Sequence, residues 1–415
     1  MLSRRDLIKG GLGGFVAVGS GILLPKLALA SVDPELWGTA VKELPGGALE
    51  SAVLEALPGK KPLIKKTYRP PNYETPVKYF NEVFTPNDVF FVRYHLANIP
   101  EINPKEWRLK VGGDSVERLL EITLEDLKTK FEQVEVVALC QCSGNRRGLM
   151  KPNVPGIEWG YGAMGNAKWK GVRLKDILNK AGLKAGALEV VVDGADTGVA
   201  AGTPDFIKSI PVWKALDENV IIAYEMNGEP LPHWNGFPAR LVVPGWTATY
   251  WIKHITSINV VAKPFDGFWM KTAYRVPLGK FPVVERFISQ ETAVNTPITE
   301  MVVNSLITNI KDGQAFRLGQ VVEVKGMAWD GGYGIKMVEI SIDGGKSWQE
   351  AELGKDYGRY SWRPWTYRFK PTKKGTYTIM AKATNRIGQT QTFELIWNPA
   401  GYHHNVVQKI SIKVL

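Results

Sequence analysis

Runs of apolar residues between Gly- and Pro-rich turns predict a chain built largely from short strands. Residues 134–139 and 188–192 are β-branched and apolar, which is typical of buried strands. Residues 107–111 and 89–95 alternate between two faces, so that Phe91, Arg93 and His95 share one of them. An arginine and a histidine on one strand face are costly unless they meet an anion.

Helical spacing is rarer along the chain. The apolar positions of 174–181 recur at helical spacing, and Gly182 follows as a stop signal. Thr123, with acidic residues just after it, predicts a second helix start. Residues 31–85 are Pro-rich and are expected to be loop-like.

The pattern changes near residue 305 to short alternating strands at regular spacing, with a hairpin turn at 343–345. The expected strands are 321–329, 336–342, 360–369, 376–383 and 391–397. This pattern predicts an immunoglobulin-like β-sandwich over 297–415, joined by a linker near 295–297 to a mixed α/β domain over 31–296. The fold class is therefore α+β.

Composition narrows the class of protein. A chain of 415 residues with 44% apolar and 22% charged residues is typical of soluble proteins with two or three domains. The net charge is +11, but Lys and Arg are scattered and no nucleic-acid motif occurs. We therefore expect small anions, and no nucleic acid, as binding partners.

The two cysteines, Cys140 and Cys142, limit the possible metal chemistry. They are too few for a disulfide framework, a Cys₄ zinc site or an iron–sulfur cluster. There is no Cys-x-x-Cys-His for covalent haem, so no haem is expected in this chain, and the five histidines form no His-x-x-x-His pair. Any redox metal must therefore arrive with an organic cofactor that supplies most of its ligands.

Cys142 itself follows a predicted buried strand and precedes a turn with two arginines, Arg146 and Arg147. Cations and backbone N–H groups beside a thiol favour the thiolate, the form that binds soft metals. The alternative is that both cysteines are small core residues. A Gly-rich segment at 159–169 is expected to let the backbone approach a ligand closely.

Residues 1–30 have the pattern of an export signal. Ser3-Arg-Arg-Asp-Leu-Ile-Lys9 is a twin-arginine motif, and Ala28-Leu-Ala30 is a cleavage site. This predicts a periplasmic protein that is exported folded and has no membrane span after cleavage, because the apolar run is short. The alternative is an amphipathic N-terminal helix.

The segment from Cys142 to Arg147 resembles the cysteine loop of the sulfite oxidase family of molybdopterin enzymes. Further blocks follow in the family's order: Phe91-Val-Arg-Tyr-His95, Gly162-Ala-Met-Gly-Asn-Ala-Lys-Trp169, Ala223-Tyr-Glu-Met-Asn-Gly-Glu-Pro-Leu231, Asn235-Gly-Phe-Pro-Ala-Arg240 with Val243-Pro-Gly245, and Ser341-Ile-Asp-Gly-Gly-Lys-Ser-Trp348. The similarity is greatest to the catalytic subunit of bacterial periplasmic sulfite dehydrogenases.

The resemblance implies a molybdenum–molybdopterin cofactor, with Cys142 as the protein ligand of the metal. It implies that Arg93 and Arg147 bind the substrate anion and that Tyr274 donates a hydrogen bond to it. Arg146 is expected to structure the loop, and Cys140 to fill the core. The cofactor-contacting positions it implies are Phe91, Val92, Arg93, Tyr94, His95, Asp196, Asn235, Arg240, Trp251, Ile252 and Lys253.

The chain departs from the family pattern at two positions. Asn235 stands where many relatives carry histidine, and no arginine follows Trp397-Asn, where relatives keep a substrate-binding one. The family register points to His404 as its replacement. That histidine could assist anion binding only while protonated. The alternative is that His403 and His404 are surface residues.

The resemblance thus implies oxidation of sulfite to sulfate, with electrons passed to a c-type cytochrome and a possible homodimer through the C-terminal domain. Alternatives are a sulfane-sulfur dehydrogenase subunit and a molybdopterin methionine sulfoxide reductase, which usually lacks a sandwich domain. A non-enzymatic alternative is a secreted sandwich protein with a decayed cofactor domain.

Overall fold

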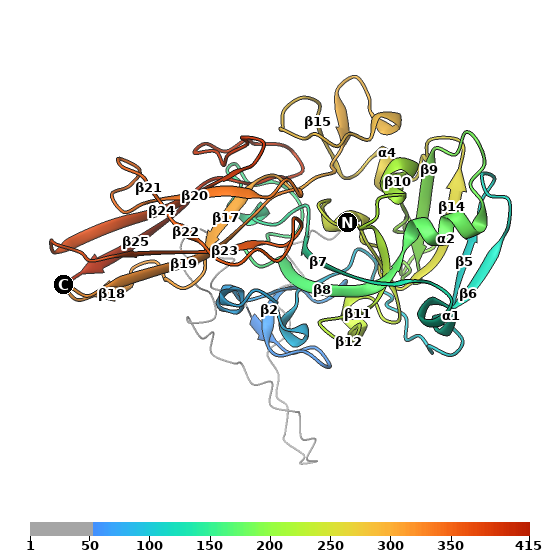
Figure 1. The fold of residues 1–415 in the computed structure, drawn as a ribbon, viewed down its shortest axis with the longest axis horizontal. Coiled ribbons are helices and arrows are strands. Elements are labelled where there is room, and N and C mark those ends of the chain that lie inside the picture. The colour runs from blue at the N-terminus through green and yellow to red at the C-terminus, as the bar shows by residue number, and fades with distance from the viewer. Residues whose placement is uncertain (1–52) are drawn as a thin grey trace, which may run out of the picture. The chain divides into compact units, whose positions relative to one another are not determined.

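The computed structural model describes residues 53–415, and this part of the chain is mostly β-structure (Figure 1). The predicted export signal lies outside the described residues. Among the described residues, the α-helices are short: α1 (Leu124–Thr129), α2 (Leu174–Ala181), α3 (Val212–Ala215) and α4 (Phe268–Lys271). Single 3-10 turns are η3 (Val77–Asn81), η4 (Asn87–Val89), η5 (Arg147–Leu149), η6 (His233–Asn235), η7 (Ala248–Tyr250) and η8 (Ile288–Gln290).

The two predicted helix signals are both confirmed. Thr123 caps α1 through a reciprocal pair of hydrogen bonds with Asp126, each 3.0 Å long. The apolar face of α2 is fully buried, and Gly182 ends the helix with a left-handed φ of 75°.

Three larger sheets form the described N-terminal part of the chain, residues 53–261. The first is ordered β1 (Val53–Glu55), β2 (Leu63–Thr67), β3 (Asn72–Glu74), β4 (Val92–Arg93). The second is ordered β10 (Lys208–Pro211), β9 (Glu189–Gly194), β14 (Ile255–Val261), β5 (Arg108–Gly112), β6 (Leu120–Thr123). The third is ordered β12 (Glu229–Pro230), β11 (Ile221–Met226), β8 (Met164–Arg173), β7 (Gln133–Gln141), with β13 (Arg240–Val242) pairing with β11.

The second and third sheets share one hydrophobic core. It contains Leu109 and Val190 from the second sheet and Ala138 and Trp169 from the third, all buried. Within the second sheet β14 pairs parallel with β5 and antiparallel with β9. The strands predicted at 107–111, 134–139 and 188–192 are confirmed as β5, β7 and β9.

The C-terminal part contains two sheets, coloured orange to red in Figure 1. One is ordered β17 (Asn304–Ile307), β19 (Val322–Trp329), β23 (Arg363–Phe369), β22 (Glu352–Leu353). The other is ordered β18 (Ala315–Phe316), β25 (Gln408–Val414), β24 (Gly375–Asn385), β20 (Ile335–Ser341), β21 (Gln349–Glu350). Both contribute to a separate core, with Val324 and Trp365 from one and Ile379 and Ile410 from the other.

Four predictions of local structure were wrong. Residues 391–397 form turns and loops rather than a strand. The final strand is β25, which lies further along the chain. The expected linker at 295–297 is β16 (Asn295–Pro297), which pairs with β15 (Arg275–Pro277). The strand expected at 89–95 is reduced to β4, and the loop-like stretch before residue 85 contributes β1 to β3.

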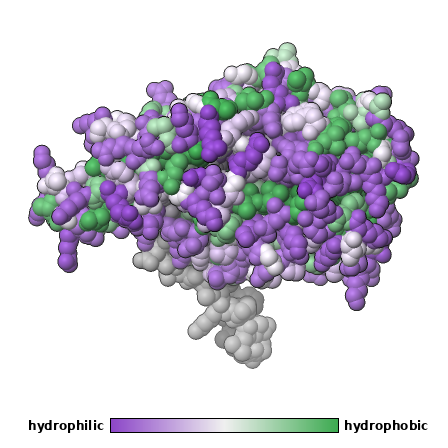
Figure 2. Space-filling view, viewed as in Figure 1, coloured by the Kyte–Doolittle hydropathy of each residue, from purple (hydrophilic) through white to green (hydrophobic). Residues whose placement is uncertain are grey.

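Hydrophilic residues predominate on the face seen in Figure 2, with smaller apolar areas between them. No helix among residues 53–415 has the length and apolar content needed to cross a membrane.

Candidate active site

Strand β7 carries Cys142 to the wall of a buried cavity. The strand pairs with β8 along its whole length, Cys140 opposite Gly165. Just beyond it, the amide of Cys142 donates to the carbonyl of Ala163 at 2.9 Å, and its carbonyl accepts from the amide of Asn145 at 3.0 Å. Arg146 then adopts a left-handed φ of 68°, so the chain turns sharply away.

The cavity gathers most of the residues predicted for the site. Its lining consists of Phe90, Phe91, Arg93, His95, Cys140, Cys142, Ser143, Asp196, Phe206, Trp234, Asn235, Arg240, Ala248, Thr249, Trp251, Ile252, Lys253 and Tyr274. Cys140 was expected to be core filler, but its thiol also lines the cavity. Burial raises the pKa of that thiol to about 11, so it stays protonated at neutral pH.

At the end of the cavity that is formed by β4 and the segment after α4, the polar side chains of His95 and Tyr274 pack among aromatic rings. The imidazole of His95 hydrogen-bonds the hydroxyl of Tyr274 and stacks on the ring of Phe206 at 3.7 Å between ring centroids. Burial, followed by the charge of Arg93, holds the pKa of His95 well below its usual range. His95 is therefore neutral at physiological pH and orients Tyr274 without adding charge.

A second group of cations lies along the cavity. The Lys253 ammonium donates to the carbonyl of Arg93 at 2.7 Å and lies 3.8 Å from the centre of the Tyr94 ring. Burial lowers its pKa to about 7, and Asp196 opposes that shift. The Arg240 guanidinium donates at 2.9 Å to the carbonyls of Asn235 and Trp251. The cavity is thus rich in cations and poor in carboxylates.

Asn235 braces the cavity wall through both ends of its amide. Its Nδ2 donates to the carbonyl of Phe91 at 3.1 Å, and its Oδ1 accepts from the ammonium of Lys60 at 2.6 Å. Lys60 also donates to the carbonyl of Phe90 at 3.1 Å. Asn235, which stands where the family pattern has histidine, is therefore held in place by a buried lysine, Lys60.

Arg147 does not line the cavity, but it is close enough for its charge to lower the pKa of His95. Its Nε donates to the carbonyl of Ala400 at 2.9 Å, and its guanidinium lies 5.3 Å from the centre of the Tyr402 ring. A Cβ atom at Gly144 or Gly401 would lie within 2.5 or 2.6 Å of its side chain, so both glycines are needed for this packing.

The structure does not bring Val92, Tyr94 or His404 to the cavity. Val92 and Tyr94 alternate with Phe91 and Arg93, point the other way and pack in a separate apolar cluster. His404 is 8% exposed, its Nδ1 has no partner among residues 53–415, and burial lowers its pKa to about 3. His404 is therefore neutral and away from the cavity, contrary to the expectation of a titrating anion ligand.

The Gly-rich segment also differs from its prediction. A Cβ at Gly162 would lie 1.9 Å from the Thr75 carbonyl oxygen, and one at Gly165 would lie 2.5 Å from the Phe90 ring. These glycines allow close approach to other parts of the protein rather than to a ligand. Glu74 fixes the same segment by accepting from the amides of Gly160 and Gly162, both at 2.8 Å.

Sequence reasoning missed several residues that the fold brings to the site or beside it: Ser143, Phe206, Lys208, Trp234, Thr249 and Tyr402. Of these, Lys208 left a signal, since it is a lysine within the apolar run Phe206-Ile-Lys-Ser-Ile210. Tyr402 left none.

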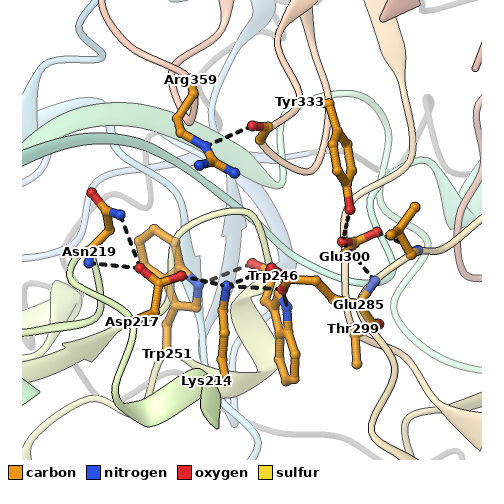
Figure 3. A network of polar contacts seen from close by, with 12 residues as sticks. Lys214, Asp217, Asn219, Trp246, Trp251, Glu285, Thr299, Glu300, Tyr333 and Arg359 are labelled. Carbon is orange, nitrogen blue, oxygen red and sulfur yellow. Dashed lines mark hydrogen bonds and ion pairs between the residues drawn. The ribbon is translucent and has the colours of Figure 1, made fainter. Parts of the chain in front are cut away.

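A polar network behind the cavity reaches the C-terminal part of the chain (Figure 3). The cavity-lining Trp251 donates from its indole to the carbonyl of Trp246 at 3.1 Å, and Trp246 in turn donates to the carboxylate of Glu285. The amide of Glu285 donates at 3.0 Å to Glu300, whose carboxylate also accepts from the hydroxyl of Tyr333. The cavity wall is thereby hydrogen-bonded to the loop before β20.

Comparison with known proteins identifies the class. The family description "Oxidoreductase molybdopterin binding domain" matches residues 95–269, and "Mo-co oxidoreductase dimerisation domain" matches residues 295–415. The chain is thus a molybdopterin-binding oxidoreductase.

Relatives define the family more narrowly. The mitochondrial sulfite oxidase of Rattus norvegicus is 35% identical over 377 residues, covering 86% of this chain and 67% of that one. The sulfite oxidase of Arabidopsis thaliana is 32% identical over 369 residues, and the alignment covers 83% of this chain and 92% of the plant protein. The chain belongs to the sulfite oxidase family, as its motifs predicted. It spans 62% to 67% of the length of the mitochondrial relatives.

A solved structure has the same fold. The crystal structure of the sulfane dehydrogenase SoxCD from Paracoccus pantotrophus superimposes with a TM-score of 0.72 at 23% identity, covering 92% of both chains.

The molybdopterin cofactor that the family defines fits the chemistry of this cavity. The Nε of Arg240 and the hydroxyl of Thr249 are buried without a hydrogen-bond partner among residues 53–415. Such groups are rare in folded proteins unless a ligand satisfies them. Arg240 and Lys253 supply the cations that a phosphate requires, and Cys142 supplies a soft ligand for the metal.

Proposed function

We propose that this protein is the catalytic subunit of a sulfite dehydrogenase that oxidises sulfite to sulfate. The observation that supports this most strongly is that one buried cavity joins the Cys142 thiol to Arg93 and Tyr274. These groups comprise a soft metal ligand, a permanent cation and a hydroxyl donor. Together they suit a small oxyanion that must meet a metal.

The side chains around the cavity have different roles in binding the substrate. Arg93, which lines the cavity, and Arg147, which lies outside its lining, attract the substrate dianion through their guanidinium groups. The Tyr274 hydroxyl, held by neutral His95, donates a hydrogen bond to one substrate oxygen. The rings of Phe206 and Phe91 line the cavity with apolar surface, which lowers the local dielectric and strengthens these electrostatic contacts.

When bound, the molybdenum cofactor supplies the two-electron redox chemistry. In the net reaction, sulfite and water give sulfate, two protons and two electrons. We propose that a c-type cytochrome accepts the electrons singly. Lys253, Arg240 and Asp196 would contact the cofactor along the cavity. A phosphorylated group there would satisfy the unpaired donors of Arg240 and Thr249.

We further propose that the protein acts in the periplasm. The support is the twin-arginine motif at Arg4 and Arg5, because that route exports proteins already folded around a cofactor. For the C-terminal part we propose an immunoglobulin-like sandwich that forms a homodimer. The two-sheet core and the description of its matching family as a dimerisation domain support this proposal.

The proposal is tested by assaying purified protein with cytochrome c and either sulfite or thiosulfate as the electron donor. Sulfite-dependent reduction is expected, with little or none from thiosulfate. Reduction with thiosulfate but not with sulfite would favour a sulfane-sulfur dehydrogenase. A purified protein that contains no metal and oxidises neither donor would favour a decayed cofactor domain.

A further inference from the structure

Lys208 is a buried lysine beside the active site that the proposed chemistry has not used. It lies in β10, its side chain is 2% exposed, and its Nζ donates to the carbonyl of Trp269 at 2.6 Å. The ammonium lies 4.7 Å from the centre of the Tyr250 ring and 5.0 Å from that of Tyr274. It is therefore packed directly against the tyrosine that lines the cavity.

No carboxylate among residues 53–415 forms an ion pair with Lys208. Burial, followed by the charge of another cation, Arg275, lowers its pKa well below the usual range. Lys214, six positions further along the chain, is equally buried at 1% exposed but pairs with Glu285 at 3.0 Å and Asp217 at 3.3 Å (Figure 3). The two lysines differ in their charge partners rather than in burial.

A buried ammonium without a carboxylate destabilises the folded protein, because it loses its water shell and gains no opposite charge. An anion that binds near such a lysine stabilises its charged form, so the two charges favour each other. Lys208 packs over the ring of Tyr274, which lines the cavity, and its charge acts on His95 in the same cavity. The field of Lys208 therefore reaches the place where the substrate would bind.

We propose that Lys208 is a positioning residue that strengthens binding of the anionic substrate, acting through Tyr274 rather than by direct contact. This inference rests on the proposed function. The ammonium attracts the dianion through a low-dielectric medium. From its position over the ring it also withdraws electron density from Tyr274, which makes the tyrosine hydroxyl a stronger hydrogen-bond donor. It thereby adds a cation to a chain that lacks the arginine its relatives carry after Trp397-Asn.

The test compares Lys208→Met with Lys214→Met in the cofactor-loaded protein. Lys208→Met is expected to raise the melting temperature, since it removes an unpaired buried charge, and to raise the KM for sulfite about 10-fold. Lys214→Met should do the opposite, lowering the melting temperature while leaving the KM for sulfite near wild type. Lys208→Arg should keep the KM closer to wild type than Lys208→Met does.

A Lys208→Met protein that is destabilised, or that binds sulfite normally, would overturn the proposal. A separate readout uses inorganic sulfate and does not depend on turnover. Sulfate, compared with chloride at equal ionic strength, should raise the melting temperature of wild type and Lys214→Met more than that of Lys208→Met. Equal sulfate shifts in all three proteins would contradict the role of Lys208. Absence of sulfite oxidation by wild type would instead refute the proposed function.

Discussion

The rings of Tyr274 and Tyr402 stack with centroids 5.5 Å apart and planes inclined by 8°. Tyr274 lines the cavity, whereas Tyr402 lies within the segment that matches the dimerisation family. The C-terminal part therefore helps to build the site, in addition to any role it has in assembly.

This contact leads to a first prediction. Tyr402→Leu should lower kcat/KM for sulfite about 2- to 12-fold, because a stacked aromatic pair contributes about 0.5–1.5 kcal/mol to holding Tyr274 in place. Tyr402→Phe keeps the ring and should remain near wild type. Steady-state kinetics of the two variants test this prediction. An equal loss of kcat/KM in both would show that activity depends on the Tyr402 hydroxyl rather than on the stacked ring.

The two cysteines should behave differently although both line the cavity. Cys142→Ser is expected to lose turnover while remaining folded, because a hydroxyl is a far poorer ligand for a soft metal than a thiolate. Cys140→Ser should keep most activity, since burial keeps that thiol protonated. Circular dichroism and initial rates of sulfite oxidation provide the comparison. If the two variants lose activity equally, Cys142 is not the sole ligand.

The neighbouring arginines offer a similar contrast. Arg147→Gln should lower kcat/KM for sulfite about 10- to 150-fold, as expected for loss of a charge-assisted interaction of about 1.5–3 kcal/mol. Arg146 instead donates to Asn304 at 2.7 Å and to the carbonyl of Ser305 at 2.8 Å, both in β17. Arg146→Gln should therefore lower the melting temperature and change sulfite KM little. An unchanged kcat/KM in Arg147→Gln would exclude it from substrate binding.

The lowered pKa of Lys253 predicts how the stability of the cofactor-free protein depends on pH. Its pKa is about 7 in the folded protein and 10.5 ordinarily, so between these values the unfolded chain binds more protons. Stability should accordingly rise with pH through this window, by at most about 1.4 kcal/mol per pH unit from this group. Below pH 7 both states are protonated, and the full cost of burying the charge remains.

Urea unfolding of wild type and Lys253→Met between about pH 7 and 9 measures this term. The wild-type midpoint should rise more steeply with pH than that of the variant. Loading the anionic cofactor should reduce the difference, because a nearby anion raises the lysine pKa again. Parallel curves for the two cofactor-free proteins would show that Lys253 keeps its ordinary pKa.

Local pattern sufficed to predict much of the site. The apolar run that became β7, the turn after Cys142 and the alternation of Phe91, Arg93 and His95 are all properties of adjacent residues. Only the family resemblance added Arg240 and Lys253. Both residues line the cavity, and their roles remain predictions.

What sequence could not predict depends on contacts between distant segments. Positive φ angles at Gly401 and His403 redirect the chain so that Tyr402 faces Tyr274 and His404 does not, and no periodicity encodes that turn. The segment around 391–397 alternates like a strand, yet it forms none. Lys208 was missed in the sequence because its significance comes from Tyr274, which tertiary folding places beside it.

The most direct test of the central proposal is the stoichiometry of sulfite oxidation by purified, molybdenum-loaded protein under anaerobic conditions. A limiting amount of sulfite is added with excess ferricytochrome c, and sulfate and ferrocytochrome c are both measured. We predict one sulfate and two reduced cytochromes for each sulfite consumed, and neither product from Cys142→Ser. A molybdenum-loaded protein that leaves sulfite unoxidised would contradict the account.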